Sequence, residues 1–165
     1  MLLWSLFDCW KRCLLSLKHL NINWHFIGKI QSNKTRDIAE KFQWVHTVDR
    51  LKIAERLNSH RPHQLPKLNV CIQVNQANET QKNGVQPSNV ANLAREIMGL
   101  PKLRLRGLMT IPPITKTSDN TRSFFAELRE QKEKLICQFQ IWLKQKHFYK
   151  CSLFQHYLQV KQEIE

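Results

Sequence analysis

The stretch Trp24–Asn33, with the sequence WHFIGKIQSN, and its continuation Lys34–Arg36 decide the fold of this chain. A short apolar segment ends at Gly28, a polar turn follows, and the pattern of a helix begins near Ser32. In α/β proteins, ligands bind at such junctions, because the carboxyl ends of strands and the amino ends of helices meet there. The stretch therefore predicts a strand–loop–helix unit with a ligand-binding loop.

The same strand–loop–helix pattern continues downstream of this stretch. Ser32 or Asn33 is predicted to cap the first helix and Asp49 the second, because these residue types accept hydrogen bonds from the first free N–H groups of a helix. The run LNVCIQVN at 68–75 is continuously apolar in character, which indicates a strand buried on both faces. The predicted strands cover 24–28, 44–48, 68–75 and 103–111, and predicted helices follow each of them, the last at 120–143.

Strict alternation of strands and helices at this spacing predicts a parallel sheet with right-handed crossovers. Four such units fit half of a (β/α)8 barrel, whose complete form takes about 250 residues. They also fit a small open doubly wound sheet. The sequence has no nucleotide-binding glycine motif that would favour this second architecture.

The two ends of the chain do not share this pattern. The start, MLLWSLFDCWKRCLLSLK, has apolar residues at helical spacing, which predicts an amphipathic helix on the core, with a membrane-surface helix as the alternative. It is too interrupted by charge for a secretory signal or a membrane span. The last stretch supports only a weak helix. We expect three parts: an aberrant apolar helix at 1–18, the strand–helix region at 19–146 and an aberrant tail at 147–165.

Composition limits the function classes. The 165 residues carry a formal net charge of +13, which is spread along the chain and not gathered in a tail. A basic protein surface explains this more simply than nonspecific contact with phosphate polymers does. The five cysteines form neither a disulfide framework nor a zinc motif. This cysteine usage favours the reducing cytoplasm.

Few side chains carry recognisable chemistry. No nucleophile–base set and no spaced pair of carboxylates is visible, so we predict no catalytic residue and no metal ligand. His25 and His46 lie in neighbouring predicted strands, where they either surround a ligand or hydrogen-bond within the core. Lys34 and Arg36 either hold an anion at a helix start or face solvent. Met109 either touches a ligand at its strand end or packs in the core.

Three blocks of the middle region resemble, in order, the pyridoxal phosphate homeostasis protein family, small relatives of the alanine racemase amino-terminal barrel. The resemblance covers about residues 19–143, and it implies a partial (β/α)8 barrel, made of the family's strands three to six, that binds pyridoxal 5′-phosphate at the carboxyl ends of its strands. The blocks are WHFIGKIQSNKTRDIAEKFQWVHTVDRLKIAERLN, LNVCIQVN with the following Lys82–Val85, and LPKLRLRGLMTIPP.

The resemblance also implies a role and a site. His25, Gly28, Asn33 and Met109 lie where family members line the cofactor cleft. The implied role is to carry or buffer the cofactor in the cytoplasm without turnover, with no specific nucleic acid partner and no membrane span. The alternatives are a fragment of a racemase-type enzyme, which needs a Schiff-base lysine and an acid–base partner, and a basic nucleic-acid-binding module, which needs clustered basic residues.

The ends of the chain depart from the family. The first-strand block, like AVSKTKP, carries the family's Schiff-base lysine, and neither it nor the second-strand block, like FGENYVQE, has a counterpart here. Residues 147–165 contain neither the SMGMS-like serine nor the glycine-serine-threonine phosphate cup. We therefore expect a truncated or frame-shifted gene product with impaired or lost cofactor binding. Open barrel edges would favour its self-association.

Overall fold

The computed structural model describes residues 19–20, 22–79, 81–113 and 118–138. The helix predicted at 1–18 and the tail at 147–165 lie outside these residues. The described elements are β1 (His25–Phe26), η1 (Ser32–Lys34), α2 (Thr35–Lys41), β2 (Trp44–Val48), α3 (Leu51–His60), β3 (Leu68–Gln73), η2 (Pro87–Asn89), α4 (Val90–Met98), β4 (Leu103–Met109) and α5 (Ser118–Gln138).

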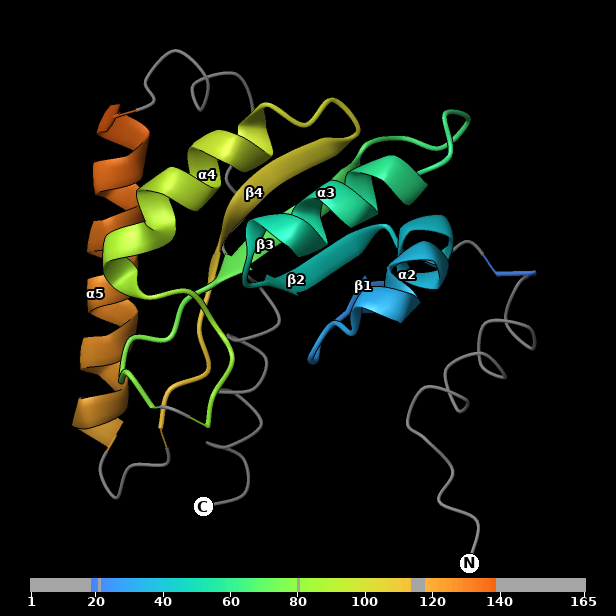
Figure 1. Ribbon diagram of the computed structural model, residues 1–165. Helices are drawn as coiled ribbons and strands as arrows, with labels where there is room; N and C mark the ends of the chain where they lie inside the picture. Colours follow the sequence, from blue (N-terminus) through green and yellow to red (C-terminus); the bar gives the residue numbers. More distant parts are fainter. Residues whose placement is uncertain (1–18, 21, 80, 114–117, 139–165) are drawn as a thin grey trace, which may run out of the picture.

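The strands form one parallel sheet in the order β1-β2-β3-β4 (Figure 1). Helices α2, α3 and α4 follow one another across a single face of this sheet, and their apolar sides meet the strands in one core. A doubly wound sheet carries helices on both faces, whereas a barrel carries them all outside. The arrangement confirms the partial-barrel prediction over the open doubly wound alternative.

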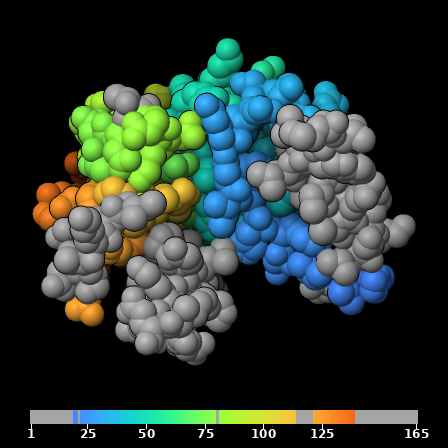
Figure 2. All heavy atoms as spheres, turned by 90° about the horizontal axis from the view of Figure 1, so that it is seen from below, coloured from blue at the N-terminus to red at the C-terminus, as the bar shows by residue number. Residues whose placement is uncertain are grey.

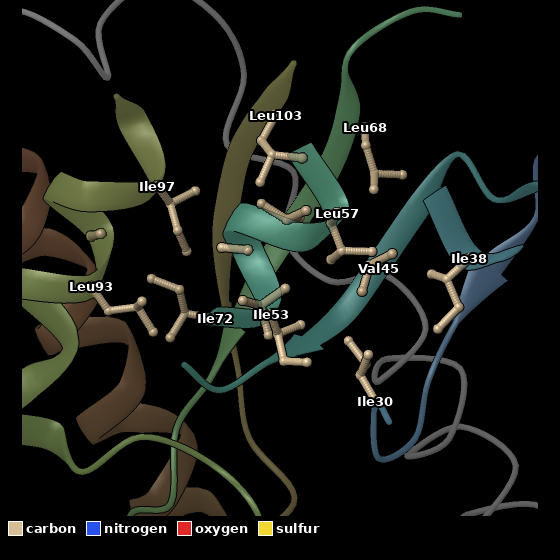
Figure 3. Packing of buried hydrophobic residues seen from close by; sticks show 14 of the residues in the cluster. Ile30, Ile38, Val45, Ile53, Leu57, Leu68, Ile72, Leu93, Ile97 and Leu103 are labelled. Atoms are coloured by element: carbon tan, nitrogen blue, oxygen red, sulfur yellow. The ribbon is translucent and has the colours of Figure 1, made fainter. Parts of the chain in front are cut away.

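The core lies between the sheet and the three helices. In Figure 3, Ile53 and Leu57 of α3 point between Val45 of β2 and Ile72 of β3. The predicted burial of β3 on both faces is confirmed, because five of its six residues are buried. The residues of β3 that do not face the helices are polar or small, and they belong to the opposite face of the sheet, here called the inner face: Asn69, Cys71 and Gln73.

Both helix-cap predictions are wrong. The residue before α2 is Lys34 and the residue before α3 is Arg50, and neither helix has a side-chain cap. Ser32 instead begins a 3₁₀ turn, and its carbonyl accepts a hydrogen bond from the Thr35 hydroxyl at 2.9 Å. Asp49 pairs with the Arg50 guanidinium at 2.8 Å. The Asp49 carboxylate therefore has a local partner that competes with capping.

One buried cation was not predicted from the sequence. Arg61 follows α3 directly and lies before a proline, yet only 2% of it is exposed. Its guanidinium donates to the carbonyls of Ala39 and Phe42 at the end of α2, and to the carbonyl of Pro66. Arg61 therefore ties the end of α2 to the end of α3 and fixes the start of β2.

Candidate functional site

The carboxyl ends of the strands lie at the lower end of the molecule in Figure 1, and Figure 2 looks directly at them. The loop after β1 (blue) and the loop after β3 (green) are both visible from this side. The chain that follows β4 (yellow to orange) lies beside the loop after β3. This is the end of the sheet where the sequence predicted a ligand.

Two of the predicted residues meet at the β1–β2 pair. His25 and His46 are on neighbouring strands, as expected, and His25 Nδ1 lies 2.9 Å from His46 Nε2. With ring centres 5.2 Å apart and the ring planes at 17°, the rings meet edge to edge. One nitrogen donates and the other accepts, so the pair shares one N–H.

Burial favours the neutral form of both imidazoles. Burial is the larger cause and the neighbouring His25 the smaller, and together they lower the pKa of His46 to about 4. Burial also lowers the pKa of His25. The charged form of His46 is disfavoured because this ring is buried and its imidazolium would lose its hydration.

Two further side chains on the inner face were not predicted. The Trp44 ring lies parallel to the His25 ring, at 6°, with centres 5.4 Å apart. The Arg106 guanidinium of β4 lies over Trp44, 5.5 Å from its ring centre, which is a cation–π contact. Arg104 and Arg106 alternate with leucines in β4, and this period of two is the signal that would have placed Arg106 on the inner face.

Gly28 adopts a backbone conformation that side chains rarely tolerate. Its φ is +137°, and its carbonyl accepts a hydrogen bond from the Thr47 hydroxyl at 2.6 Å. A Cβ at this position would meet nothing within 4 Å, so the backbone is open to an approaching ligand. Thr47 itself is buried.

The other two predicted residues lie apart. Asn33 is exposed in η1, a few residues after Gly28. Met109 is the last residue of β4, is buried, and pairs with Gln73 of β3. Since β1 and β4 are separated by three strand spacings, His25 and Met109 lie on strands roughly 14 Å apart. The structure therefore groups His25, Gly28 and Asn33 at one edge of the sheet and leaves Met109 at the other.

The loop after β3 folds tightly over the carboxyl end of the sheet. Lys82 Nζ donates to Glu79 at 2.9 Å and to the carbonyl of Pro112, after β4, at 3.3 Å. Gly84 has a φ of +133°, and a Cβ there would lie 2.8 Å from the backbone nitrogen of Asn75. The loop is thus closed by packing that only glycine permits.

Over the described ranges, no three histidine, cysteine, aspartate or glutamate side chains gather to hold a metal ion. The same part of the chain contains no helix that is long and apolar enough to cross a membrane.

Comparison with known proteins finds relatives that are similar to this chain in sequence and in fold. The chain is 58% identical over 114 residues to the pyridoxal phosphate homeostasis protein of Pseudomonas aeruginosa, which is 69% of this chain and 50% of that protein. Two structures of PipY from Synechococcus elongatus are similar: one without pyridoxal phosphate (TM-score 0.72, 32% identity, 78% of this chain and 60% of PipY) and one with it bound (TM-score 0.69, 30% identity, 78% and 59%).

An alanine racemase of Clostridium difficile shares the fold at 16% identity, with a TM-score of 0.59 over 75% of this chain and 33% of that enzyme. The chain spans about half the length of the curated relatives that it matches. The family model of the alanine racemase N-terminal domain matches residues 16–148. The resemblance inferred from the sequence is confirmed: the chain belongs to the alanine racemase N-terminal domain family.

Proposed function

We propose that this chain contributes one side of a pyridoxal 5′-phosphate cleft in a (β/α)8 barrel, and that it carries or buffers the cofactor without turnover. The observation that supports this best is the sheet, in which four parallel strands follow in chain order with their helices on one face. PipY, which has this fold, was solved with pyridoxal phosphate bound. The relatives in Pseudomonas aeruginosa and Escherichia coli are named for homeostasis of this cofactor.

We assign the cofactor to four residues, His25, Gly28, Asn33 and Met109. The first three lie on β1 and on the segment that follows it, at the carboxyl end of the sheet. The open space at Gly28 would let a flat ring approach the backbone closely. The neutral imidazole of His25 can donate or accept a hydrogen bond, and Asn33 can do both. Met109 would contribute an apolar contact from β4.

The types of side chain present fit the cofactor only in part. The cofactor carries a phosphate and an aldehyde that bonds to amines. Lys29, Lys34 and Arg36 follow β1 closely and can complement phosphate charge. None of the four strands in the described part of the chain carries a lysine, however. We infer that these residues hold the cofactor by hydrogen bonds and charge, and that its covalent capture by this chain is impaired.

Two other functions receive less support. A racemase-type enzyme needs a lysine and an acid–base partner facing the cofactor, and the described strands supply neither a lysine nor a tyrosine. A nucleic-acid-binding module needs basic side chains gathered on one face. The pKa of His60 is lowered by burial first, and then by the nearby Arg36 and Arg56. Glu40 lies close enough to raise this pKa, so an acidic side chain interrupts the two basic ones.

The decisive experiment mixes the purified 165-residue chain with pyridoxal 5′-phosphate, records the absorbance spectrum, and identifies adducts by mass spectrometry after borohydride reduction. We expect reversible binding with adducts scattered at low yield over several lysines. Pyridoxal without phosphate is the matched control, and it should bind more weakly. A stoichiometric adduct on a single lysine would overturn the proposed impairment, and no binding at any concentration would overturn the proposed carrier role.

We further propose that the chain is cytoplasmic and self-associates through the sheet edges. Of the strands that the structure describes, β1 and β4 each pair on one side only. Free strand edges are templates for pairing with another chain. Light scattering during size-exclusion chromatography should give a mass that rises with concentration. A constant monomer mass over a hundredfold dilution series would contradict the edge-pairing proposal.

A further inference from the structure

The edge strand β1 has little backbone pairing to hold it. Its two residues pair only with β2, His25 opposite Trp44 and Phe26 opposite Val45. Just before it, the Trp24 carbonyl accepts from the backbone nitrogens of Gln43 and Trp44 at 3.0 and 3.1 Å. By contrast, β3 and β4 share six registered pairs. The β1 segment must therefore be oriented mainly by other contacts.

Side chains of β2 supply those contacts. His46 Nε2 lies 2.9 Å from His25 Nδ1, and the Thr47 hydroxyl donates to the Gly28 carbonyl at 2.6 Å. Only 3% of His46 and 3% of Thr47 is exposed. Two consecutive buried side chains of β2 thus reach two of the residues assigned to the cofactor.

The bond from Thr47 fixes a peptide plane. The peptide between Gly28 and Lys29 is trans, because the described chain has no cis peptide bond. In a trans peptide, the C=O and N–H groups point in opposite directions. Since the Gly28 carbonyl points at Thr47, the N–H of Lys29 points away from β2. Thr47 therefore sets the direction of a backbone donor in the candidate cofactor loop.

We propose that His46 and Thr47 are positioning residues: they orient His25 and Gly28 from behind, and neither side chain contacts the ligand. The inference rests on the proposed function for the identity of the ligand. The orientation itself follows from the two hydrogen bonds and from the burial of both side chains. It gives β2 a role in the site, although none of the residues assigned to the cofactor lies on β2.

The test of Thr47 uses an isotope pair that isolates one peptide bond. The chain has four glycines, and only Gly28 is followed by a lysine. Labelling glycine carbonyl carbons with ¹³C and lysine nitrogens with ¹⁵N therefore selects the Gly28–Lys29 peptide alone. Thr47→Val keeps the shape of the side chain and removes the donor, so the Gly28 carbonyl resonance should move upfield. Thr47→Ser, which keeps the hydroxyl, should restore it.

Thr110→Val is the matched control. Thr110 is also buried, and its hydroxyl donates to the Val74 carbonyl at 2.9 Å, on the β3–β4 side of the sheet. This variant should destabilise the chain as Thr47→Val does and leave the Gly28 carbonyl resonance in place. An unmoved Gly28 resonance in Thr47→Val, or the same shift in Thr110→Val, would overturn the role of Thr47.

The role of His46 has its own signature. In the wild type, the Nδ1 resonance of His25 in an ¹⁵N spectrum should show that this nitrogen shares a proton. His46→Phe should return it to the value of a solvated imidazole, and His46→Gln, which keeps a hydrogen-bonding amide, should restore part of the difference. A His25 spectrum that is identical in the wild type and in His46→Phe would overturn the pairing.

Affinity for pyridoxal 5′-phosphate then separates this inference from the proposed function. Thr47→Val should weaken binding about fivefold, the factor that corresponds to one net hydrogen bond, with rescue by Thr47→Ser. If the wild type binds and Thr47→Val binds with the same affinity, the positioning role is overturned. Absence of binding by the wild type would overturn the proposed function, and the spectra would still decide whether β2 orients the loop.

Discussion

The two edges of the sheet are held by different forces. β3 and β4 pair along six residues and bury their apolar side chains against α3 and α4. β1 has two residues, and the side chains of His46 and Thr47 complete its attachment to β2. The difference teaches that two of the four residues assigned to the cofactor, His25 and Gly28, lie where orientation depends on single side-chain bonds. Binding residues often lie on loops and edges of this kind, and a packed scaffold holds those loops in position.

The largest effect should come from the packed side. Ile72 of β3 is completely buried and has Val48 and Leu108 as its neighbours across the strands. Ile72→Ala should lower the free energy of unfolding by about 4 kcal/mol, because the lost transfer energy adds to the cost of the cavity. Urea denaturation measures this loss.

Ile27→Ala is the control for that substitution on the weakly held side. Ile27 follows β1 and is 55% exposed. Its truncation should change the free energy of unfolding by less than about 0.5 kcal/mol. Equal losses in the two variants would mean that the β1 side is as closely packed as the β3 side.

Arg61→Ala should have the next largest effect, a loss of about 3 kcal/mol. The substitution leaves the carbonyls of Ala39, Phe42 and Pro66 without their donor and removes a buried side chain. Arg61→Lys should recover only part of this loss, because an ammonium cannot present the same fork of donors. Thermal or urea unfolding distinguishes the three proteins. Full recovery by lysine would show that charge alone matters at this position.

The sequence predicted the strands and helices better than the side-chain contacts that join them. β2 was predicted to the residue, and the helical spacing of Ile53, Ala54 and Leu57 predicted α3, because hydrophobic periodicity is a local property. Burial of Arg61 could not be predicted in this way, since its partners at Ala39 and Phe42 lie 22 and 19 positions away. Tertiary contacts of this range leave no periodic signal.

The candidate site shows the same limit. Gly28 and His25 were assigned to the site from the sequence, and His46 was expected either beside a ligand or hydrogen-bonded in the core, but Thr47 was not singled out. Thr47 reads as an ordinary β-branched strand residue, and only the structure shows that its hydroxyl reaches the Gly28 carbonyl. The strand predicted at 24–28 was too long for a related reason: an apolar pattern predicts extended chain, whereas pairing with β2 decides how much of it is strand.

Substitutions at two glycines, Gly28 after β1 and Gly84 in the loop after β3, compare the stability of the two regions directly. At Gly84, a Cβ would lie 2.8 Å from the backbone nitrogen of Asn75, so Gly84→Ala combines a clash with an unfavourable φ. At Gly28 the φ is similarly unfavourable, but the space is open. We expect losses of about 3 kcal/mol for Gly84→Ala and about 1.5 kcal/mol for Gly28→Ala. Chemical denaturation of the pair measures both, and a larger loss at Gly28 would contradict the comparison.

A further stability effect that we expect is a pH dependence from the His25–His46 pair. His46 has a pKa of about 4 in the folded chain, below its usual value of about 6.5 in an unfolded chain. Between these values the unfolded state binds more protons, so the contribution is complete above pH 6.5 and is lost as the pH falls toward 4. After allowance for solvent screening at His25, the loss should be about 2 kcal/mol.

Urea unfolding at several pH values between 4 and 7 measures this loss, and two variants locate its source. His46→Gln cannot titrate in this range, so its stability should fall less steeply below pH 6.5 than that of the wild type. His60→Gln removes a half-buried histidine whose pKa is also lowered, by burial first and then by Arg36 and Arg56, so it should flatten the slope less than His46→Gln does. Because carboxylates titrate equally in all three proteins, only the difference in slope reports the histidine. If His46→Gln and the wild type fall in parallel, the pair on β1 and β2 does not bind protons differently in the folded and unfolded chains.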